Sequence, residues 1–290
     1  MPAPPPDTRS QRATVTAVRP TGADAVVLRV RLACPTPPLR AARFFMLRRA
    51  DRRSPAIPRP FSLYRTVQCS LSSTGLYECE LEFLIKVMGE GTRALAESRP
   101  GDTLLAVGPL GHGWPTIDGA GAPWVMVAGG IGSAPFYMGI QQALEGMDGR
   151  TPCKPEDITL IYGGRHRGFL YDLDLFTELG VRVVPATDDG SAGFHGNVVQ
   201  ALREEWHQGR IPMRVRLLAC GPERMMEAVA HVADEHGLDC WLSLETYMGC
   251  GVGICNGCAV PTTAAGDLGA WPVAKCCVDG PVFAARDVIL

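Results

Sequence analysis

Four cysteines near the C-terminal end are the residues of this chain with the clearest chemistry. Cys250, Cys255, Cys258 and Cys277 follow the spacing C-x4-C-x2-C-x18-C. Plant-type [2Fe-2S] clusters are held by four thiolates with C-x4-C-x2-C spacing and a fourth cysteine farther along the chain. The spacing therefore predicts a one-electron carrier held by these four residues.

Glycines alternate with the first three of these cysteines, at Gly249, Gly251, Gly253 and Gly257. Only glycine adopts positive φ without steric cost, so the backbone can approach a cluster closely. A structural zinc site is the alternative, but four-cysteine zinc sites usually take their ligands as two closely spaced pairs. A disulfide knot is disfavoured because nothing marks the chain as secreted.

Length and composition limit the remaining possibilities. The chain has 290 residues and is 46% hydrophobic, enough for two or three domains with sizeable cores. A net charge of −2 gives no electrostatic footprint for nucleic acid or anionic lipid. The first fifteen residues have no apolar run of the signal-peptide type, and the uncharged stretch 119–144 is broken by Pro123 and Pro135. We expect a cytoplasmic protein with no membrane span.

Seven further cysteines lie outside the predicted cluster. In a reducing compartment we expect most of them to be small core residues. They are Cys34, Cys69, Cys79, Cys153, Cys220, Cys240 and Cys276.

Short β-rich runs punctuated by proline and glycine fill residues 13–110, which predicts a small antiparallel barrel. Arg59-Pro60-Phe61-Ser62 lies within it. A guanidinium suits a pyrophosphate, an aromatic ring can lie against a flavin, and a hydroxyl can bind a ring heteroatom. A plain strand entered through a proline explains the tetrapeptide equally well.

A second glycine-containing turn follows from Lys86 to Leu95. Here a predicted strand runs into Gly89 and Gly91, and a short helix that Thr92 begins would present free N–H groups to a phosphate. An ordinary strand-to-helix turn is the alternative.

Beyond residue 113 the pattern changes to alternating apolar strands and amphipathic helices. This alternation predicts a parallel, doubly wound sheet, which binds ligands at the carboxyl ends of its strands. The predicted strands are Trp124–Ala128, Ile158–Tyr162, Val181–Ala186 and Val215–Cys220, and the predicted helices are Leu173–Leu179, Asn197–Trp206 and Glu223–His236.

Three loops should meet at that edge: Gly129–Pro135, Thr187–Ser191 and Cys220–Glu223. The first departs from the dinucleotide fingerprint G-x-G-x-x-G in its third glycine, so a tight packing turn is also possible. After the second strand, the basic run 165–167 could meet an adenosine 2′-phosphate or form a solvated turn.

Taken in order, these motifs resemble one family. R-P-F-S, G-E-G-T, G-P-L-G, G-G-I-G-S-A-P, T-D-D-G-S, C-G-P and C-x4-C-x2-C followed by C-V-D-G-P-V-F are similar to the electron-transfer subunits of class 1B dihydroorotate dehydrogenases, members of the ferredoxin-reductase superfamily. The resemblance covers about 13–283. It implies a disordered tail (1–12), an FAD-binding β barrel (13–117), an NAD-binding α/β domain (118–238) and a [2Fe-2S] domain (239–290).

The resemblance also assigns roles to residues of this chain. FAD would be bound by Arg59, Pro60, Phe61, Ser62, Lys86, Gly91 and Thr92. NAD would be bound by Gly130, Gly132, Pro135, Gly221 and Pro222, with Cys220 near the nicotinamide and the roles of Asp188 and Asp189 open. Cys277 would be the fourth cluster ligand and Cys276 the spare thiol.

The implied function is the relay of electrons from a partner subunit to NAD+ in pyrimidine biosynthesis. The FMN of that partner would oxidise dihydroorotate, and the cluster and FAD would pass the electrons on, with two copies of each subunit in the assembly. Two departures leave the partner open: the segment 39–46 lacks the usual Pro-Gly-Gln, and residues 269–272 lie in an insert. One alternative is a reductase subunit of a hydrogenase, sulfide dehydrogenase or ferredoxin oxidoreductase. Another is a zinc-stabilised nucleotide-binding module.

Overall fold

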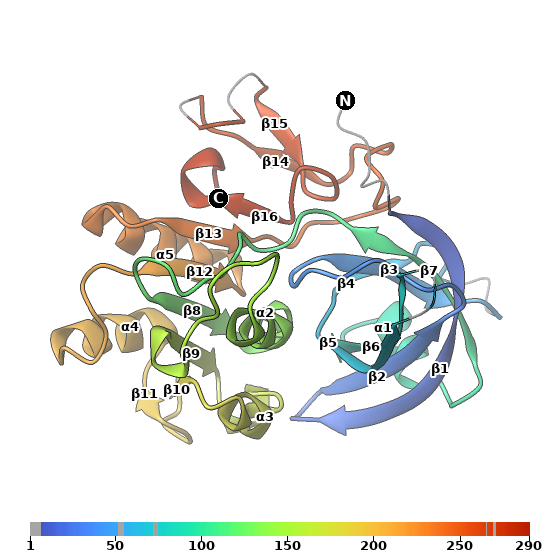
Figure 1. The fold of residues 1–290 in the computed structure, drawn as a ribbon, viewed down its shortest axis with the longest axis horizontal. Helices are drawn as coiled ribbons and strands as arrows, with labels where there is room; N and C mark the ends of the chain where they lie inside the picture. The colour runs from blue at the N-terminus through green and yellow to red at the C-terminus, as the bar shows by residue number, and fades with distance from the viewer. Residues whose placement is uncertain (1–6, 52–54, 72, 74, 265, 269–270) are drawn as a thin grey trace.

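The computed structural model describes residues 7–290 except 52–54, 72, 74, 265 and 269–270. Figure 1 shows an N-terminal barrel beside an α/β unit, with a small C-terminal hairpin above both. The predicted fold class is therefore confirmed.

The barrel is a seven-stranded antiparallel sheet with the order β4-β3-β7-β1-β2-β6-β5. The six strands that the sequence predicts here, 13–18, 25–32, 43–47, 61–64, 76–87 and 103–107, are all present with small shifts of their ends. The sequence missed β5, because its residues are half-buried or exposed and show no apolar run. The strands are β1 (Arg9–Thr21), β2 (Ala25–Leu32), β3 (Phe44–Arg49), β4 (Arg59–Ser62), β5 (Arg65–Leu71), β6 (Tyr77–Lys86) and β7 (Thr103–Leu110). Cys69 of β5 and Cys79 of β6 form a disulfide and Cys34 is exposed, so these three are not the core residues expected from the sequence.

The predicted disordered tail, 1–12, is wrong for residues 9–12. Strand β1 begins at Arg9, and residues 9–12 pair with β7 from Gly108 to Leu105. The backbone ladder thus orders residues whose composition suggested disorder. Asp7 adds an ion pair of 2.6 Å with the buried guanidinium of Arg43. Residues 1–6 lie outside the described part of the chain.

Helix α1 (Glu90–Ala96) begins two residues before the predicted start at Thr92, with Gly89 as its N-cap. The Thr92 hydroxyl accepts hydrogen bonds from the backbone N–H groups of Met88 and Gly89, at 2.9 and 3.0 Å. Threonine at the third helical position thus closes the turn that precedes it.

The second sheet has the order β11-β10-β9-β8-β12-β13-β16 and is parallel except for its last pair. The chain runs outward from β8 to β11, then returns to place β12 on the other side of β8. This reversal creates the crevice in which such sheets bind ligands. The strands are β8 (Trp124–Gly129), β9 (Ile158–Gly164), β10 (Arg182–Thr187), β11 (Phe194–His195), β12 (Arg216–Cys220), β13 (Cys240–Ser243) and β16 (Val282–Ala284).

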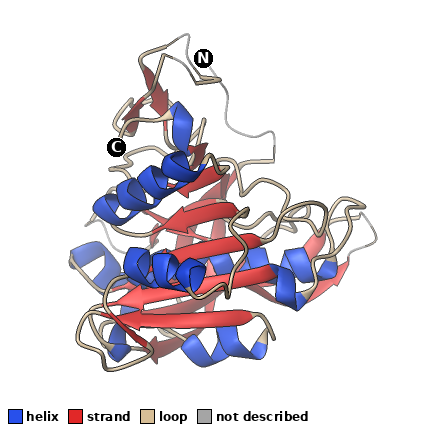
Figure 2. Cartoon of the chain, turned by 90° about the vertical axis from the view of Figure 1, so that its left-hand side faces the viewer, coloured by secondary structure: helices blue, strands red, loops and turns tan. Residues whose placement is uncertain are grey.

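Helices cover both faces of this sheet, as Figure 2 shows. Residues of α2 and α3 share one core with the barrel, and those of α4 and α5 share a second core with the C-terminal unit. Among the described residues, no helix has the length and apolar character needed to cross a bilayer. The helices are α2 (Ala134–Glu145), α3 (Leu173–Glu178), α4 (Val198–His207) and α5 (Glu223–His236).

The C-terminal unit contains the hairpin β14 (Ala259–Pro261) and β15 (Val273–Lys275). Two strands from the predicted cluster domain, β13 and β16, belong instead to the large parallel sheet. The sheet therefore extends beyond the predicted boundary at residue 238, and the division of the chain into domains stays a prediction.

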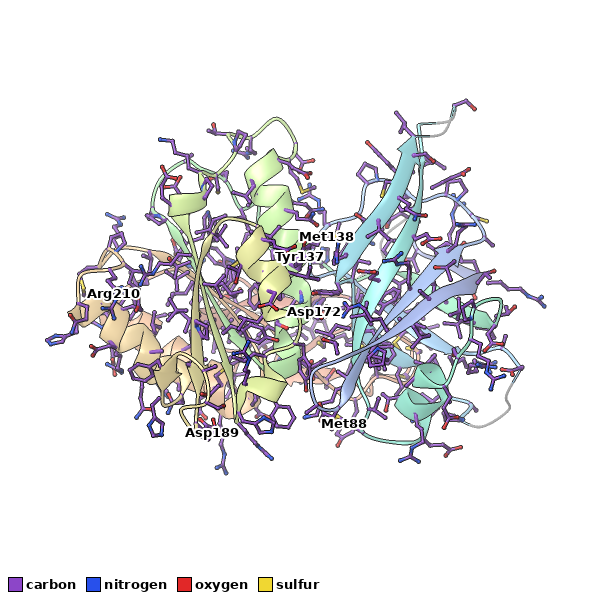
Figure 3. All side chains as sticks on the ribbon, turned by 90° about the horizontal axis from the view of Figure 1, so that it is seen from below. Met88, Tyr137, Met138, Asp172, Asp189 and Arg210 are labelled. Atoms are coloured by element: carbon purple, nitrogen blue, oxygen red, sulfur yellow. A yellow bond between two sulfur atoms is a disulfide. The ribbon has the colours of Figure 1, made fainter. Side chains whose placement is uncertain are left out.

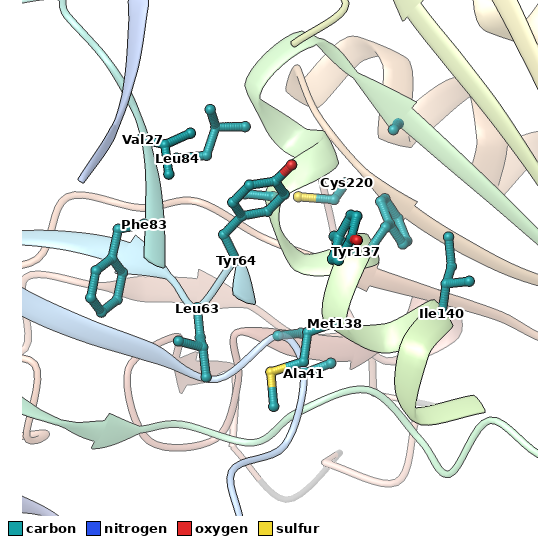
Figure 4. Close-up of a cluster of buried hydrophobic side chains, with 14 of the residues drawn as sticks. Val27, Ala41, Leu63, Tyr64, Phe83, Leu84, Tyr137, Met138, Ile140 and Cys220 are labelled. Atoms are coloured by element: carbon teal, nitrogen blue, oxygen red, sulfur yellow. The ribbon is translucent and has the colours of Figure 1, made fainter. Parts of the chain in front are cut away.

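One carboxylate ties the barrel to the α/β unit. Asp172 accepts hydrogen bonds from Arg19 at 2.6 and 2.9 Å, from Thr21 at 2.6 Å and from Tyr64 at 3.1 Å. Figure 3 shows Asp172 at the junction between the two units. Beside it, the rings of Tyr64 and Tyr137 meet edge to face at 5.4 Å, close to Cys220 (Figure 4). The junction thus combines an ion pair with an aromatic core.

Candidate functional site

The four predicted cluster ligands lie together in the C-terminal unit, as two pairs. The Sγ atoms of Cys258 and Cys277 are 3.2 Å apart. The sulfur of Cys250 accepts hydrogen bonds from the backbone N–H groups of Val252 and Cys255, both at 3.4 Å, and from the Cys255 thiol. Cys255 is exposed, whereas Cys258 and Cys277 are buried.

This pairing bears on the kind of metal centre. A structural zinc site needs four ligands on one ion, whereas four cysteines shared by two irons provide two ligands for each. The arrangement therefore suits a binuclear cluster better than zinc.

The thiols of the two pairs differ in how readily they ionise. Burial raises the pKa of Cys250, but the N–H groups of Cys255 and Val252 outweigh it and lower the pKa to about 7. The hydrogen bond shared with Cys277 lowers the pKa of Cys258 to about 6 and raises that of Cys277. Thiolates are the form that binds metal, so one thiol in each pair favours the ligating state.

The spare thiol, Cys276, points away from this group. It is fully buried, and its Sγ lies 3.5 Å from the carbonyl oxygen of Leu244. Burial raises the pKa of Cys276 to about 12. A neutral, buried thiol that is bonded to a backbone carbonyl fits the predicted assignment of Cys277, not Cys276, as the fourth ligand.

Glycine brings the cluster loop against the barrel. Gly251 has φ +73°, and a Cβ there would lie 2.6 Å from Met46 Cγ and 3.0 Å from Leu110 Cδ1. Met46 pairs with Pro60 in the β3–β4 ladder. The cluster loop is thus one strand away from the tetrapeptide predicted to bind FAD.

The predicted FAD residues fall into two groups. Arg59, Pro60, Phe61 and Ser62 form β4, which is an edge strand of the barrel and lies on the side facing α2 (Figure 1). A Cβ on Gly91 would lie 3.4 Å from Arg59 Nε, so the guanidinium covers the first turn of α1. Thr92 lies in that turn and uses its hydroxyl to cap it.

The crevice of the parallel sheet holds a cavity of about 750 Å³. Strand ends of both sheets line it, and so do the C-terminal unit and the last two residues of the chain. Its lining includes Lys86 and Met88 from the barrel, Gly129–Ile131, Gly163–Arg165, Asp188, Gly221–Glu223 and Leu244–Thr246 from the sheet, and Ala259–Pro261, Ile289 and Leu290.

Two glycine turns meet at the floor of this cavity. A Cβ on Gly132 would lie 2.3 Å from the carbonyl oxygen of Cys220, and one on Gly221 would lie 3.0 Å from Gly129 Cα. Gly130 has φ +55° and open space before it. Because glycine has no side chain, the turn after β8 and the turn after β12 can touch each other and still leave space for a flat ligand above them.

The predicted nucleotide residues do not all face the cavity. Gly130, Gly221 and Pro222 line it, whereas Gly132 packs beneath it. Pro135 is in the first turn of α2 and accepts a hydrogen bond from the Trp114 indole at 3.1 Å.

Cys220 also lies behind the cavity wall. Its thiol is 3% exposed, and burial raises its pKa. Lys86, which the family resemblance places at FAD, lines this cavity, and its assignment to FAD stays a prediction. There it lies 3.5 Å from Asp24 and 5.1 Å from the centre of the Phe169 ring.

The two neighbouring acidic residues left open by the sequence have different roles. Asp188 lines the cavity. Asp189 caps its own loop, because its carboxylate accepts hydrogen bonds from the N–H and hydroxyl of Ser191 at 2.9 and 2.6 Å. These hydrogen bonds lower the pKa of Asp189. Of the basic run 165–167, only Arg165 is among the lining residues.

Sequence reasoning gave no role to Glu245, which lies two residues after the end of β13 and lines the cavity. Surrounding protein raises the pKa of this carboxyl, although the cavity leaves it open to solvent. The available signal was its position, since a carboxylate just after a buried parallel strand lies at the binding edge of the sheet.

Comparison with known proteins agrees with this arrangement. Residues 245–289 match the model of the iron-sulfur cluster binding domain of dihydroorotate dehydrogenase B, and residues 126–231 match the oxidoreductase NAD-binding domain. A dihydroorotate dehydrogenase B (NAD(+)) electron transfer subunit from Desulforamulus reducens is 31% identical over 246 residues, with 85% of each chain covered. The chain belongs to this family of electron transfer subunits. Another member, from Geobacillus sp. (strain WCH70), is 34% identical over 85% of this chain and 86% of its own.

Solved structures place this electron transfer subunit among ferredoxin reductases. An NADH-dependent reduced ferredoxin-NADP oxidoreductase has a TM-score of 0.74 and 26% identity, covering 96% of this chain and 89% of that one. A ferredoxin NADP+ reductase from Neisseria gonorrhoeae, with a TM-score of 0.60 and 20% identity over 79% of this chain and 92% of that one, shares the fold. The predicted cofactors, FAD, an iron–sulfur cluster and NAD, are thus confirmed, and the chain is an oxidoreductase subunit.

Proposed function

We propose that this chain accepts electrons from a dihydroorotate-oxidising partner subunit and delivers them through a [2Fe-2S] cluster and FAD to NAD+. The observation that carries the proposal is the seating of the cluster loop on β3, next to the strand Arg59–Ser62. The nucleotide cavity reaches both the barrel, at Lys86, and the cluster unit, at Ala259–Pro261. One compact region thus contains places for all three redox groups.

The chain's own side chains would bind and orient these groups. When bound, FAD exchanges electrons singly with an iron–sulfur cluster and in pairs with nicotinamide. The Arg59 guanidinium above Gly91 supplies a fork of donors for a pyrophosphate, and Phe61 and Ser62 continue along the same edge strand. The turns at Gly130 and Gly221 would hold the nicotinamide nucleotide, and Cys250, Cys255, Cys258 and Cys277 would hold the cluster.

The partner would be an FMN-containing catalytic subunit, in an assembly of two plus two. The exposed ligand Cys255 is flanked by large apolar side chains: Ile254 is 79% exposed and Tyr247 is 95% exposed. Exposed apolar groups of this size are typical of protein–protein contacts. A partner that docks on this face would place its own redox group next to the cluster. The cytoplasmic location stays a prediction.

A second candidate keeps the cofactors and changes the partner. The match to an NADH-dependent reduced ferredoxin-NADP oxidoreductase covers 96% of this chain, more than the dihydroorotate dehydrogenase relatives described above. In that case the same cluster would exchange electrons with a ferredoxin oxidoreductase subunit.

Reconstitution with each partner decides between them. The purified subunit, loaded with FAD and cluster, is mixed with the catalytic dihydroorotate dehydrogenase subunit encoded in the same genome, and NAD+ reduction is followed at saturating dihydroorotate. The proposal expects NADH formation that requires both subunits. A pair that reduces dyes from NADH but ignores dihydroorotate contradicts the proposal and favours the second candidate.

A further inference from the structure

One lysine lies between the two segments that carry the predicted cluster ligands. Three of these ligands are in the loop 250–258, and the fourth, Cys277, follows β15. Lys275 is the last residue of β15, and it pairs with Ala259 of β14, the residue directly after Cys258. Sequence reasoning gave this lysine no role. Its place in the hairpin puts a positively charged side chain beside both ligand segments.

The side chain of Lys275 extends to the loop. Its Nζ donates a hydrogen bond of 2.6 Å to the carbonyl oxygen of Gly253. Gly253 has φ +81°, and a Cβ there would lie 2.7 Å from Val278 Cγ2, so glycine is required where the loop packs on this turn. The backbone N–H of Gly253 bonds to the sulfur of Cys277. Lys275 therefore holds the residue of the loop that contacts the fourth ligand.

The backbone of Lys275 orders the other ligand segment. Its N–H donates a hydrogen bond of 2.6 Å to the carboxylate of Asp279. Its carbonyl oxygen accepts hydrogen bonds from the N–H groups of Val278 and Asp279, at 3.0 and 2.8 Å. These bonds close the turn that contains Cys277. The same residue thus fixes the Cys277 turn through its backbone and the loop 250–258 through its side chain.

The charge of Lys275 also acts on the ligand sulfurs. The hydrogen bond with Cys277 is the main cause of the lowered pKa of Cys258, and the positive charge of Lys275 lowers it further. A positive charge stabilises negative charge at these sulfurs. A cluster held by four thiolates becomes more negative when it takes up an electron, and its reduction potential depends on the charges and hydrogen bonds around the sulfurs. A lysine at this place therefore favours the reduced cluster.

We propose that Lys275 is a positioning residue for the iron–sulfur cluster, which joins the two ligand segments and raises the reduction potential of the cluster. A higher potential favours the transfer of electrons from a partner subunit to this chain. The inference rests on the proposed function in that it requires the cluster, but it does not depend on which partner supplies the electrons.

The test is an anaerobic redox titration of the full-length subunit loaded with FAD and cluster, with the reduced cluster measured by electron paramagnetic resonance. Lys275→Gln keeps a hydrogen-bond donor and removes the charge. At a fixed potential, we expect its ratio of reduced to oxidised cluster to fall about fivefold, which for one electron is a midpoint potential lower by about 40 mV. Lys275→Arg keeps the charge and should stay within about twofold of the wild-type ratio.

Arg286→Gln is the matched control, because it removes a positive charge from the same C-terminal unit at a side chain that is 70% exposed and paired with Asp267. Its midpoint potential should equal that of the wild type. The proposal is overturned if Lys275→Gln titrates like the wild type, or if Arg286→Gln shifts the potential equally far.

The iron content of each variant completes the test. Iron that is lost from Lys275→Gln but kept by Lys275→Arg would support the proposal, since both side chains are donors and only arginine keeps the charge. Loss of iron from both variants would overturn it, because the lysine would then serve assembly of the cluster alone. A wild-type subunit that binds no iron would contradict the proposed function itself, whereas an unchanged potential in Lys275→Gln would contradict only this inference.

Discussion

The cluster loop and the nucleotide cavity are assembled in opposite ways. The loop gathers three of its four predicted ligands from residues 250–258, and glycines between them set the backbone path. The cavity is lined by residues from Lys86 to Leu290, contributed by two sheets and the C-terminal unit. The first site depends on local spacing, and the second depends on sheet topology.

This difference predicts how each site responds to change. Each cysteine of the loop would bind only the cluster, so removing one should abolish cluster binding and leave the binding of FAD and NAD unchanged. A residue beneath the cavity acts through contacts between distant strands, so its replacement should disturb stability and binding together. Mutations at the two sites can therefore test whether they are independent.

The largest effect is expected for Cys255→Ser in the subunit paired with its catalytic partner. Removal of one thiolate ligand should prevent cluster assembly, with a decrease on the order of 100-fold or more in dihydroorotate-dependent NAD+ reduction. FAD content and NADH–dye reductase activity should persist, because the cavity and β4 are untouched. Iron analysis, flavin absorption and the two assays together measure this separation.

Cys276→Ser is the matched control. It changes a buried cysteine that is next to the predicted ligand Cys277 but donates a hydrogen bond to the carbonyl oxygen of Leu244. It should keep the cluster and both activities. Loss of iron from Cys276→Ser would show that the ligand assignment is wrong, and loss of FAD from Cys255→Ser would show that the two sites are not independent.

Gly132→Ala tests the cavity floor. The new Cβ would lie 2.3 Å from the carbonyl oxygen of Cys220, so the β8 and β12 turns must separate. We expect the free energy of unfolding to fall by about 2 kcal/mol, an overpacking cost, and the KM for NADH to rise. Gly89→Ala meets nothing within 4 Å at an extended φ and loses only the preference of an N-cap for glycine over alanine, so it should cost about 0.5–1 kcal/mol. Equal denaturation midpoints for Gly132→Ala and Gly89→Ala would contradict the close contact between Gly132 and Cys220.

The same contrast explains what the sequence could predict. Cys250, Cys255 and Cys258 could be found because their chemistry is encoded in nearby positions. Apolar runs likewise predicted the other strands of the barrel and the four strands β8, β9, β10 and β12 of the second sheet. They did not predict β5, whose exposed side chains show no pattern, or the short strands β11, β13 and β16. The position of Lys86 in the nucleotide cavity depends on how the barrel and the second sheet pack together, and the Cys69–Cys79 disulfide depends on the register of β5 with β6. Register of this kind is set by the whole sheet and by turn geometry.

A smaller, pH-dependent effect is expected at the junction between the units. Burial raises the pKa of Asp172, but Arg19 and the hydroxyls of Thr21 and Tyr64 outweigh it, so the pKa is lowered. The contribution of the Asp172 carboxylate to stability is fully present above its pKa in the unfolded chain, about 3.9. It is lost as the pH falls through the lower pKa that Asp172 has in the folded protein. Asp172→Asn should therefore cost about 1–2 kcal/mol at pH 7, a value that allows for solvent screening at the half-exposed Arg19.

Denaturant unfolding at several pH values measures this effect. The difference between wild type and Asp172→Asn should stay constant from pH 6 to 8 and shrink below about pH 4. Asp174→Asn, at an exposed position in the first turn of α3, is the control and should cost less than about 1 kcal/mol. A difference that does not depend on pH would mean that Asp172 contributes through packing and not through charge.

The smallest effect is expected for Glu245→Gln, within the cavity itself. A nicotinamide dinucleotide carries negative phosphates, and the Glu245 carboxylate faces the space that we propose it fills. Replacing the carboxylate by an amide should lower the KM for NADH by about threefold, roughly 0.6 kcal/mol. The raised pKa of Glu245 means that the wild-type carboxyl takes up its proton at a higher pH than an ordinary glutamate, so the two KM values should converge as the pH is lowered. A fall in kcat at constant KM would instead show that Glu245 touches the reacting atoms, and the cavity would then contain a catalytic group that spacing along the chain could not reveal.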